Sequence, residues 1–338
     1  MRALLFFMLI TILTSCYDKI KILPGPEPPV QAQIDTIFIS TAAQLDNVRN
    51  NLSGYYKLVT NIDLTDYLSI DSPGNPDGFG WQPIGDIQRH FAGTFDGNGY
   101  TITGLTIDRT SYYYVGLFAY ISNATIKNLG VEISPNGLFG GYFTGGLIGY
   151  AYNSTITGCY SKGDVAGVGS WVGGLIGFIT TSELINSYAV GNVLGFSSLA
   201  VVGGLVGGCN AVIENCYAAG TVNSFYAAGG LVGALNMGSM NNCVSLSQSV
   251  KGNAFVGRVA GVLGMSGTLI NNGARSDMEV IMDNEFKTVI NNSGNIDGES
   301  FIATALQQKS TYEDMGWDFT TVWTIDEGNG YPSLQRRP

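Results

Sequence analysis

Two glutamates are the best candidates in this sequence for acid–base chemistry. Glu183 and Glu214 lie one sequence repeat apart. One rise between stacked strands plus two residues along a strand would separate their carboxyl groups by roughly 8 Å, a spacing that suits an inverting glycosidase. However, the neighbouring sequence offers neither a basic residue nor an apolar pocket that would shift the pKa of either carboxyl. We therefore expect two hydrated surface acids, no catalytic residue, and a protein that is not an enzyme.

Metal and cofactor sites have little support in the sequence. The chain has one histidine, His90, so a histidine-based metal site or catalytic triad would need a second chain. Asp71, Asn75 and Asp77 place oxygen atoms within one short loop, but their spacing does not match the calcium-binding loop. A weak calcium site there stays open, although tight turns are the prediction for this loop and for Asp96 to Gly99. We expect no metal and no cofactor.

The cysteines recur at one position of the repeats. Cys159, Cys216 and Cys243 are equivalent to one another, and Ser187 takes the same position between the first two. An exported protein permits disulfides. Stacked side chains nevertheless project in parallel, whereas a disulfide needs Cβ atoms that converge. We predict that these cysteines and Cys209 are buried free thiols.

Aromatic residues gather just before a repeated glycine motif, in the loop that closes each repeat. The series comprises Tyr112, Tyr113, Tyr114, Tyr142, Phe143, Trp171, Phe196, Phe225, Tyr226 and Phe255. Stacked repeats should bring these rings to one side, where exposed rings could bind sugar rings or a partner protein. Rings that merely fill corners of the fold are the alternative, and the sequence leaves both open. The candidate ligand-binding residues are Tyr113, Tyr142, Trp171, Phe225 and Tyr226.

The elements that position these residues are predicted from internal repetition. A Gly-Gly-Leu-(Ile/Val)-Gly motif recurs every 26 to 31 residues. A second column, usually Asn followed by a small or apolar residue, follows each motif in constant phase and includes Asn128, Asn186, Asn215, Asn242 and Asn272. The motif copies begin at Val115, Gly145, Gly173, Gly203, Gly229 and Ala260.

A repeat of this length, with short apolar runs and no helical period, is typical of one coil of a β-solenoid. We predict an all-β fold: a parallel β-helix, right-handed, with about three strands per coil over residues 109–273. Ile156, Leu184 and Ile213 are expected to form an interior column, and the Gly pairs to allow close approach of neighbouring backbones. The 47 Gly and only 12% charged residues agree with such an architecture.

Both ends of the solenoid are predicted to be capped. Residues 34–108 should form the opening coils and one short helix near 42–50, which starts at a Thr41-x-x-Gln44 capping box and buries Leu45 and Val48. Residues 274–338 should form a C-terminal capping segment.

The N-terminal residues carry export signals. Residues 1–15 combine Arg2 with an apolar run too short to span a bilayer, as in a secretory signal peptide. Leu13-Thr14-Ser15-Cys16 resembles the bacterial lipobox, which implies cleavage and lipidation at Cys16. Residues 16–33 contain four prolines and should form an extended stalk. The formal net charge of −10 argues against nucleic acid as a partner.

The Gly-Gly-Leu-(Ile/Val)-Gly repeats resemble those of the GLUG-motif family, common among surface proteins of Bacteroidetes. Residues 91–102 are similar to the segment that precedes such repeats, and residues 316–334 to their terminal segment. The resemblance implies an adhesin-like role and supplies no catalytic residue.

We therefore expect a surface-exposed outer-membrane lipoprotein of the cell envelope. It would be held to the membrane by its lipid and would bind a carbohydrate or a host or bacterial surface protein through one side of the solenoid. A β-helix enzyme that hydrolyses or cleaves polysaccharides and a structural subunit of a fimbria-like assembly are the alternatives.

Overall fold

The computed structural model describes residues 35–335. Cys16, the predicted signal peptide and the predicted stalk lie outside the described residues, so their predictions stay predictions. Thr36–Pro338 forms one compact unit. No helix within the described part of the chain is long and apolar enough to cross a lipid bilayer.

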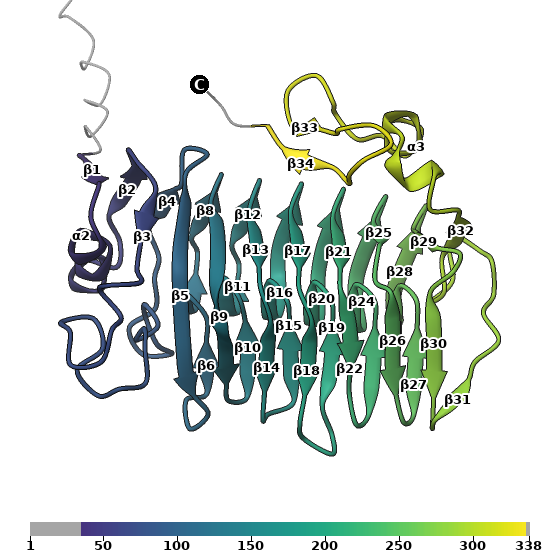
Figure 1. Ribbon diagram of the computed structural model, residues 1–338, viewed down its shortest axis with the longest axis horizontal. Coiled ribbons are helices and arrows are strands. Elements are labelled where there is room, and N and C mark those ends of the chain that lie inside the picture. The colour runs from purple at the N-terminus through teal and green to yellow at the C-terminus, as the bar shows by residue number, and fades with distance from the viewer. Residues whose placement is uncertain (1–34, 336–338) are drawn as a thin grey trace, which may run out of the picture. The chain divides into compact units, whose positions relative to one another are not determined.

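The compact unit is a stack of coils, and each full coil passes through three parallel sheets that we name C, A and B in that order (Figure 1). The prediction of a parallel β-solenoid with about three strands per coil is confirmed. Strand pairs are parallel from coil to coil; the antiparallel strand pairs among residues 35–335 are β30–β31 and β33–β34.

The strand bounds follow the three sheets. Sheet C contains β6 (Tyr114–Val115), β10 (Phe143–Gly145), β15 (Trp171–Gly173), β19 (Val201–Gly203), β23 (Ala227–Gly229) and β27 (Phe255–Gly257). Sheet A contains β1 (Thr36–Ile39), β2 (Tyr55–Leu58), β4 (Thr94–Asp96), β7 (Phe118–Ser122), β8 (Thr125–Lys127), β11 (Ile148–Tyr152), β12 (Thr155–Thr157), β16 (Ile176–Ile185), β20 (Val206–Glu214), β24 (Val232–Asn241) and β28 (Ala260–Ile270). Sheet B contains β3 (Ile62–Asp63), β5 (Thr101–Arg109), β9 (Gly130–Gly140), β13 (Tyr160–Lys162), β14 (Val165–Gly167), β17 (Tyr188–Val190), β18 (Val193–Gly195), β21 (Tyr217–Ala219), β22 (Thr221–Asn223), β25 (Val244–Ser245), β26 (Ser249–Gly252), β29 (Gly273–Arg275), β30 (Glu279–Met282), β31 (Glu285–Phe286) and β32 (Glu299–Phe301).

The interior is built from columns of equivalent side chains. Ile156, Leu184 and Ile213 pair in register on β12, β16 and β20 and are fully buried, as predicted. The leucine of each glycine motif also points inward, and burial of such side chains is the main stabilising contribution to the stack. These motif leucines are Leu117, Leu147, Leu175, Leu205 and Leu231.

The glycine columns lie where neighbouring coils touch. A Cβ atom added at Gly174 would collide with the carbonyl oxygen of Gly204 and lie 2.9 Å from the Cβ of Ala189. A Cβ atom at Gly204 would collide in the same way with the carbonyl oxygen of Gly230. The predicted close backbone approach is therefore present at both positions.

The asparagine column forms left-handed turns between sheets A and B. Asn128, Asn186, Asn215 and Asn242 have φ between 50° and 54°, a conformation that asparagine tolerates well. The last member is Asn271, with φ 53°, and the assignment of Asn272 to this column was wrong by one residue. Asn272 is instead buried in the cysteine column, where its Oδ1 accepts a hydrogen bond from the backbone N–H of Cys243 at 3.0 Å.

The last motif copy also differs from its assignment at Ala260. Pairing of Gly229 with Gly257 and of Val232 with Ala260 aligns residues 257–261 with the motif. Arg258 takes the place of the second glycine, so the sequence carries no Gly-Gly pair there. Its buried guanidinium donates hydrogen bonds to the carbonyl oxygens of Asp297 and Gly298 at 2.8 and 2.9 Å, in the segment that closes this end of the stack.

At the N-terminal end, a short helix covers the core. Helix α2 (Ala42–Asp46) continues into the 3₁₀ turn η1 (Asn47–Asn50), and Leu45 and Val48 are fully buried, as predicted. The Thr41 hydroxyl accepts a hydrogen bond from the N–H of Gln44 at 3.2 Å. The Gln44 side chain reaches back to the N–H of Ser40 rather than to that of Thr41.

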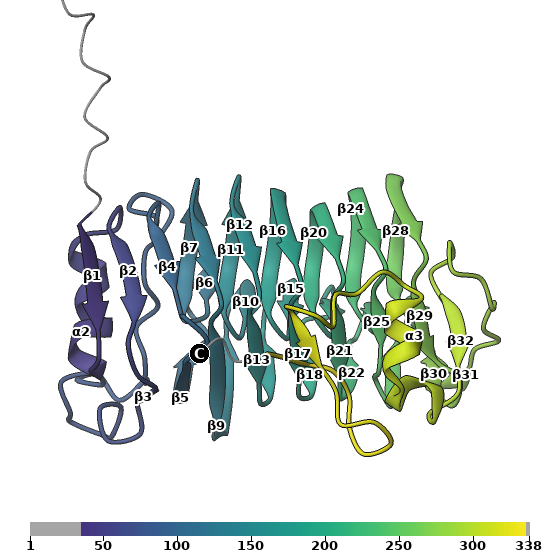
Figure 2. The same ribbon diagram turned by 90° about the horizontal axis from the view of Figure 1, so that it is seen from above.

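The C-terminal residues divide into two parts. Residues 274–301 continue the coils through β30 and β32. The following segment, residues 305–335, folds back onto the outer face of sheet B beside β17 and β21 (Figure 2). This segment contains η2 (Ala305–Gln307), α3 (Lys309–Glu313), β33 (Trp323–Thr324) and β34 (Ser333–Leu334).

Candidate functional site

The candidate aromatic residues lie on the outside of the coils. Tyr113 and Tyr142 precede β6 and β10, and Trp171 opens β15. Tyr113 is 55% exposed, Tyr142 36%, and Trp171 is half-buried. Phe225 is 52% exposed. These residues are therefore available to a ligand and are not buried corner fillers.

Neighbouring coils place the first rings face to face. The ring centroids of Tyr113 and Tyr142 are 4.7 Å apart with an interplanar angle of 7°. Tyr114 and Phe143 pair in register on β6 and β10, and their rings stack at 5.3 Å. The spacing of rings thus follows the spacing of the coils.

A second aromatic column lies on sheet A and was not predicted. Tyr120, Tyr150 and Phe178 occupy equivalent positions on β7, β11 and β16. Successive rings stack at 4.8 and 5.4 Å. A sequence signal was available, because each of these residues directly follows the fifth position of a glycine motif in the first three repeats.

The two columns meet at the outer junction of sheets C and A. Their rings touch edge to face, at interplanar angles between 85° and 89° for the first and third contacts and 84° for the second. The contacts are Tyr114–Tyr120 at 5.2 Å, Phe143–Tyr150 at 5.2 Å and Trp171–Phe178 at 5.0 Å. We name the continuous surface of eight rings the aromatic seam: Tyr113, Tyr114, Tyr120, Tyr142, Phe143, Tyr150, Trp171 and Phe178.

The aromatic seam ends where the next coil has small residues. Gly208 pairs with Phe178, and a Cβ atom at Gly208 would collide with the rings of Trp171 and Phe178. Beyond it, Val201, Ala227 and Ala234 form a small outer apolar cluster, and Trp171 and Tyr226 pack against this cluster from two sides. The structure therefore brings Tyr113, Tyr142 and Trp171 together and places Tyr226 beside the end of the seam.

The aromatic seam is electrically neutral. None of its eight residues carries a charge at neutral pH, because burial raises the pKa of the Tyr114 phenol to about 12 and also raises the pKa of Tyr120 and of Tyr150. The rings offer apolar area and tyrosine hydroxyl groups. Such a surface suits a ligand with apolar patches and hydrogen-bonding oxygens.

The two glutamates do not form a recognisable acid–base pair. Glu183 pairs with Val212, and Glu214 pairs with Ile185, so their register differs by two residues. Glu183 is exposed and Glu214 half-buried, and within residues 35–335 neither side chain forms a salt bridge.

The oxygen-rich loop near Asp71 is occupied by the chain's own hydrogen bonds. Both carboxylate oxygens of Asp77 accept hydrogen bonds from the buried Arg109 guanidinium, at 2.7 and 2.9 Å. The amide of Asn75 bonds the backbone at Leu68 and Gly80. A guanidinium at Asp77 repels a cation, so this arrangement does not favour calcium.

The four described cysteines are buried free thiols, in agreement with the prediction. Residues of the cysteine column accept hydrogen bonds from the preceding coil: the Ser187 hydroxyl accepts from the N–H of Cys159 at 3.1 Å. Burial raises the pKa of Cys159 and of Cys209 to about 12, which keeps both thiols protonated and unreactive at neutral pH.

We expect the native chain from residue 34 onward to react with a thiol reagent at pH 8 only slowly. In denaturant, Cys159, Cys209, Cys216 and Cys243 should all react, because unfolding exposes them and restores an ordinary thiol pKa. Counting thiols with Ellman's reagent, without a reductant, checks this. A count of two would show that a disulfide forms.

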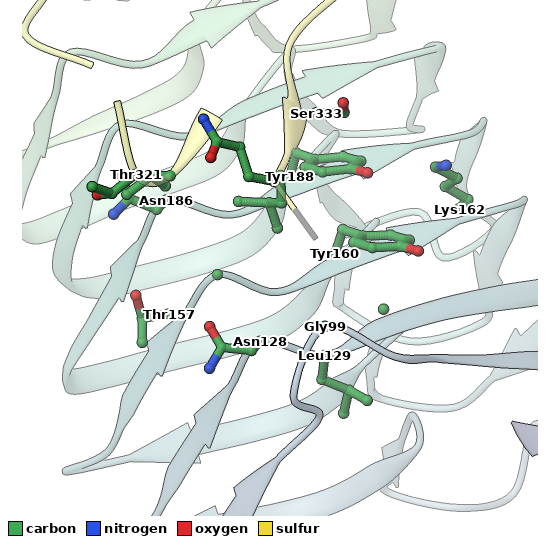
Figure 3. Close-up of a pocket in the computed structure, with 15 residues that line it drawn as sticks. Gly99, Asn128, Leu129, Thr157, Tyr160, Lys162, Asn186, Tyr188, Thr321 and Ser333 are labelled. Atoms are coloured by element: carbon green, nitrogen blue, oxygen red, sulfur yellow. The ribbon is translucent and has the colours of Figure 1, made fainter. Parts of the chain in front are cut away.

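A small pocket lies elsewhere, between the asparagine turns and the C-terminal segment (Figure 3). Its volume is about 250 Å³. Tyr160 and Tyr188 stack along one wall, with Lys162 5.1 Å from the Tyr160 ring, and Thr321 and Ser333 lie opposite. Asn128 and Asn186 reach this pocket, but their conformation is already explained by their turns.

Comparison with known proteins gives one family match. A family model described as the GLUG motif matches residues 140–166, which include the motif at Gly145–Gly149.

Two curated relatives match parts of the chain. The "Putative Gly-rich membrane protein" of Evansella cellulosilytica is 53% identical over 94 residues, which are 27% of this chain and 10% of that protein. Halomucin of Haloquadratum walsbyi is 33% identical over 152 residues, which are 42% of this chain and 2% of that protein. The chain thus spans a tenth or less of the length of either relative.

One solved structure has a similar fold. It is the crystal structure titled as that of a "putative immunoglobulin A1 protease" from Bacteroides ovatus. The TM-score is 0.53 at 20% sequence identity, and the match covers 90% of this chain and 92% of that one. At this identity the likeness concerns the fold alone.

Proposed function

Because the chain is a GLUG-motif repeat protein folded as a parallel β-solenoid, we propose that it is a binding or adhesion module of the cell envelope. Its ligand, a glycan or a host or bacterial surface protein, contacts the aromatic seam. The observation that carries this proposal is that eight outward rings from two sheets form one neutral surface. Aromatic anchors supply much of the free energy of binding at interfaces.

The location follows from independent features of the sequence and its relatives. We propose that Cys16 is lipidated and that the chain is an outer-membrane lipoprotein that faces the exterior. One relative is named a membrane protein, and another a mucin of a haloarchaeon, which supports association with the envelope.

Binding is favoured over polysaccharide cleavage because the most promising acids lack the surroundings that catalysis needs. Neither Glu183 nor Glu214 has a basic partner within the described residues, and Glu183 is fully open to water. A general acid needs a raised pKa, which hydrated carboxyls do not have.

A structural role has one observation in its favour. β28 is the last strand of sheet A, and among residues 35–335 it pairs with β24 alone. Leu263 and Met265 are exposed on it, and residues 260–270 contain no charge or proline to block pairing with another chain. Ultracentrifugation over a range of concentrations tests this. Self-association that Met265→Lys removes would favour a structural subunit.

Trp171→Ala should weaken ligand binding by roughly 1 to 2 kcal/mol or more, since an interfacial tryptophan is a frequent hot spot. An array of glycans and matrix proteins probed with residues 34–338 would identify the ligand, and calorimetry would measure the change. The matched control is Glu183→Gln with Glu214→Gln, which should leave binding unchanged. Binding that survives Trp171→Ala but disappears with the two glutamine substitutions would argue for an enzyme.

A further inference from the structure

The chain itself contains a covered counterpart of the aromatic seam. On the outer face of sheet B, Tyr160, Tyr188 and Tyr217 pair in register on β13, β17 and β21. Their rings stack at 4.9 and 4.7 Å with interplanar angles of 5° and 6°. This column has the same geometry as Tyr113–Tyr142 and Tyr120–Tyr150–Phe178.

Residues 305–335 show how such a column is covered. The Trp323 ring lies 6.2 Å from Tyr188 and 6.1 Å from Tyr217, tilted by 43° and 49°. Trp317 lies 6.4 Å from Tyr217. The hydroxyl of Tyr217 donates a hydrogen bond to the backbone carbonyl of Pro332 at 2.7 Å. The covering polypeptide therefore uses tryptophan rings against the column and a backbone carbonyl for a tyrosine hydroxyl.

Stacking decides which ligands the exposed rings can accept. A sugar ring binds an aromatic side chain by lying on its face, and stacked rings at 4.7 to 5.4 Å leave no space for it between them. Seven of the eight seam rings belong to such stacks, and Trp171 alone makes only an edge contact. The seam therefore presents mainly ring edges and hydroxyl groups to solvent.

We propose that the aromatic seam binds a polypeptide, one that presents tryptophan side chains and free backbone carbonyls as residues 305–335 do on sheet B. This inference rests on the proposed function and narrows its ligand class. The neutral seam offers no charge for an acidic or basic ligand, whereas ring edges and tyrosine hydroxyls match aromatic side chains and carbonyl oxygens.

The test uses the full chain in detergent micelles and two probes. A phage library of random 12-residue peptides is selected on it, and the peptides obtained are synthesised with and without Trp→Ala changes. Neutral oligosaccharides, cellohexaose and chitohexaose, form the second probe. Each ligand is titrated against the parent chain, Tyr142→Ala, and Tyr113→Ala with Tyr142→Ala. Phe286→Ala is the matched control, because Phe286 is 77% exposed on β31 and lies outside the seam.

We expect tryptophan-containing peptides whose affinity falls about tenfold or more in the double variant, in Tyr142→Ala to a smaller degree, and in the Trp→Ala peptides. Phe286→Ala should leave affinity unchanged, and thermal melts should show that each variant is folded. Oligosaccharides that bind in a seam-dependent way without such peptides would overturn this inference and leave the proposed function standing. Seam-dependent peptides that tolerate Trp→Ala would overturn the tryptophan chemistry. If no ligand depends on the seam, both proposals fail.

Discussion

Replacing Gly174 or Gly204 by valine should destabilise the solenoid by well over the ~1 kcal/mol of a typical substitution. Each new side chain would collide with the carbonyl oxygen of the next coil, Gly204 for the first change and Gly230 for the second. The backbone cannot yield locally, because every coil is hydrogen-bonded to its neighbours on both sides. A lower melting temperature by circular dichroism, or failure to fold, is the expected result.

Gly330→Val provides the control for this prediction. A Cβ atom at Gly330 would meet no atom nearer than the carbonyl oxygen of Asp326 at 4.0 Å, and Gly330 has no left-handed φ. The control variant should melt close to the parent chain. If Gly174→Val also melted with the parent, the coils could not be packed as tightly as the structure has them.

Cys16→Ala should release the protein from cell membranes. We expect this large effect because acyl chains on Cys16 would supply about 0.8 kcal/mol of binding per buried CH₂, and the described residues contain no helix able to span the bilayer. Fractionation of cells and labelling with a radioactive fatty acid measure the anchor directly.

Cys159→Ser is the matched control for the lipid anchor. Ser187 already occupies the equivalent position on the next coil, so the solenoid should accept serine at Cys159. This variant should keep both the label and its place in the membrane fraction. Membrane association that persists after Cys16→Ala would show that another part of the protein anchors it.

The candidate site was half visible in the sequence. Tyr113, Tyr142 and Trp171 could be chosen because they precede a repeated motif, and repetition alone implies that they share one side. Tyr120, Tyr150 and Phe178 were missed, although they recur in phase with the motif. Their importance depends on the angle between sheets C and A, which brings the outward rings of both sheets into contact. A repeat period carries no information about that angle.

The sequence by itself determined the solenoid, its interior columns, the left-handed asparagine turns and the helix that begins after Thr41. Each of these follows from local chemistry repeated at a constant period, so an inward residue of one coil predicts the next. Only the tertiary structure decided the register of the last coil, where Arg258 replaces a glycine, and the place of residues 305–335 on sheet B. The physical reason is that both depend on contacts between residues far apart in the chain, Arg258 with Asp297 and Tyr217 with Trp323, and neither contact repeats.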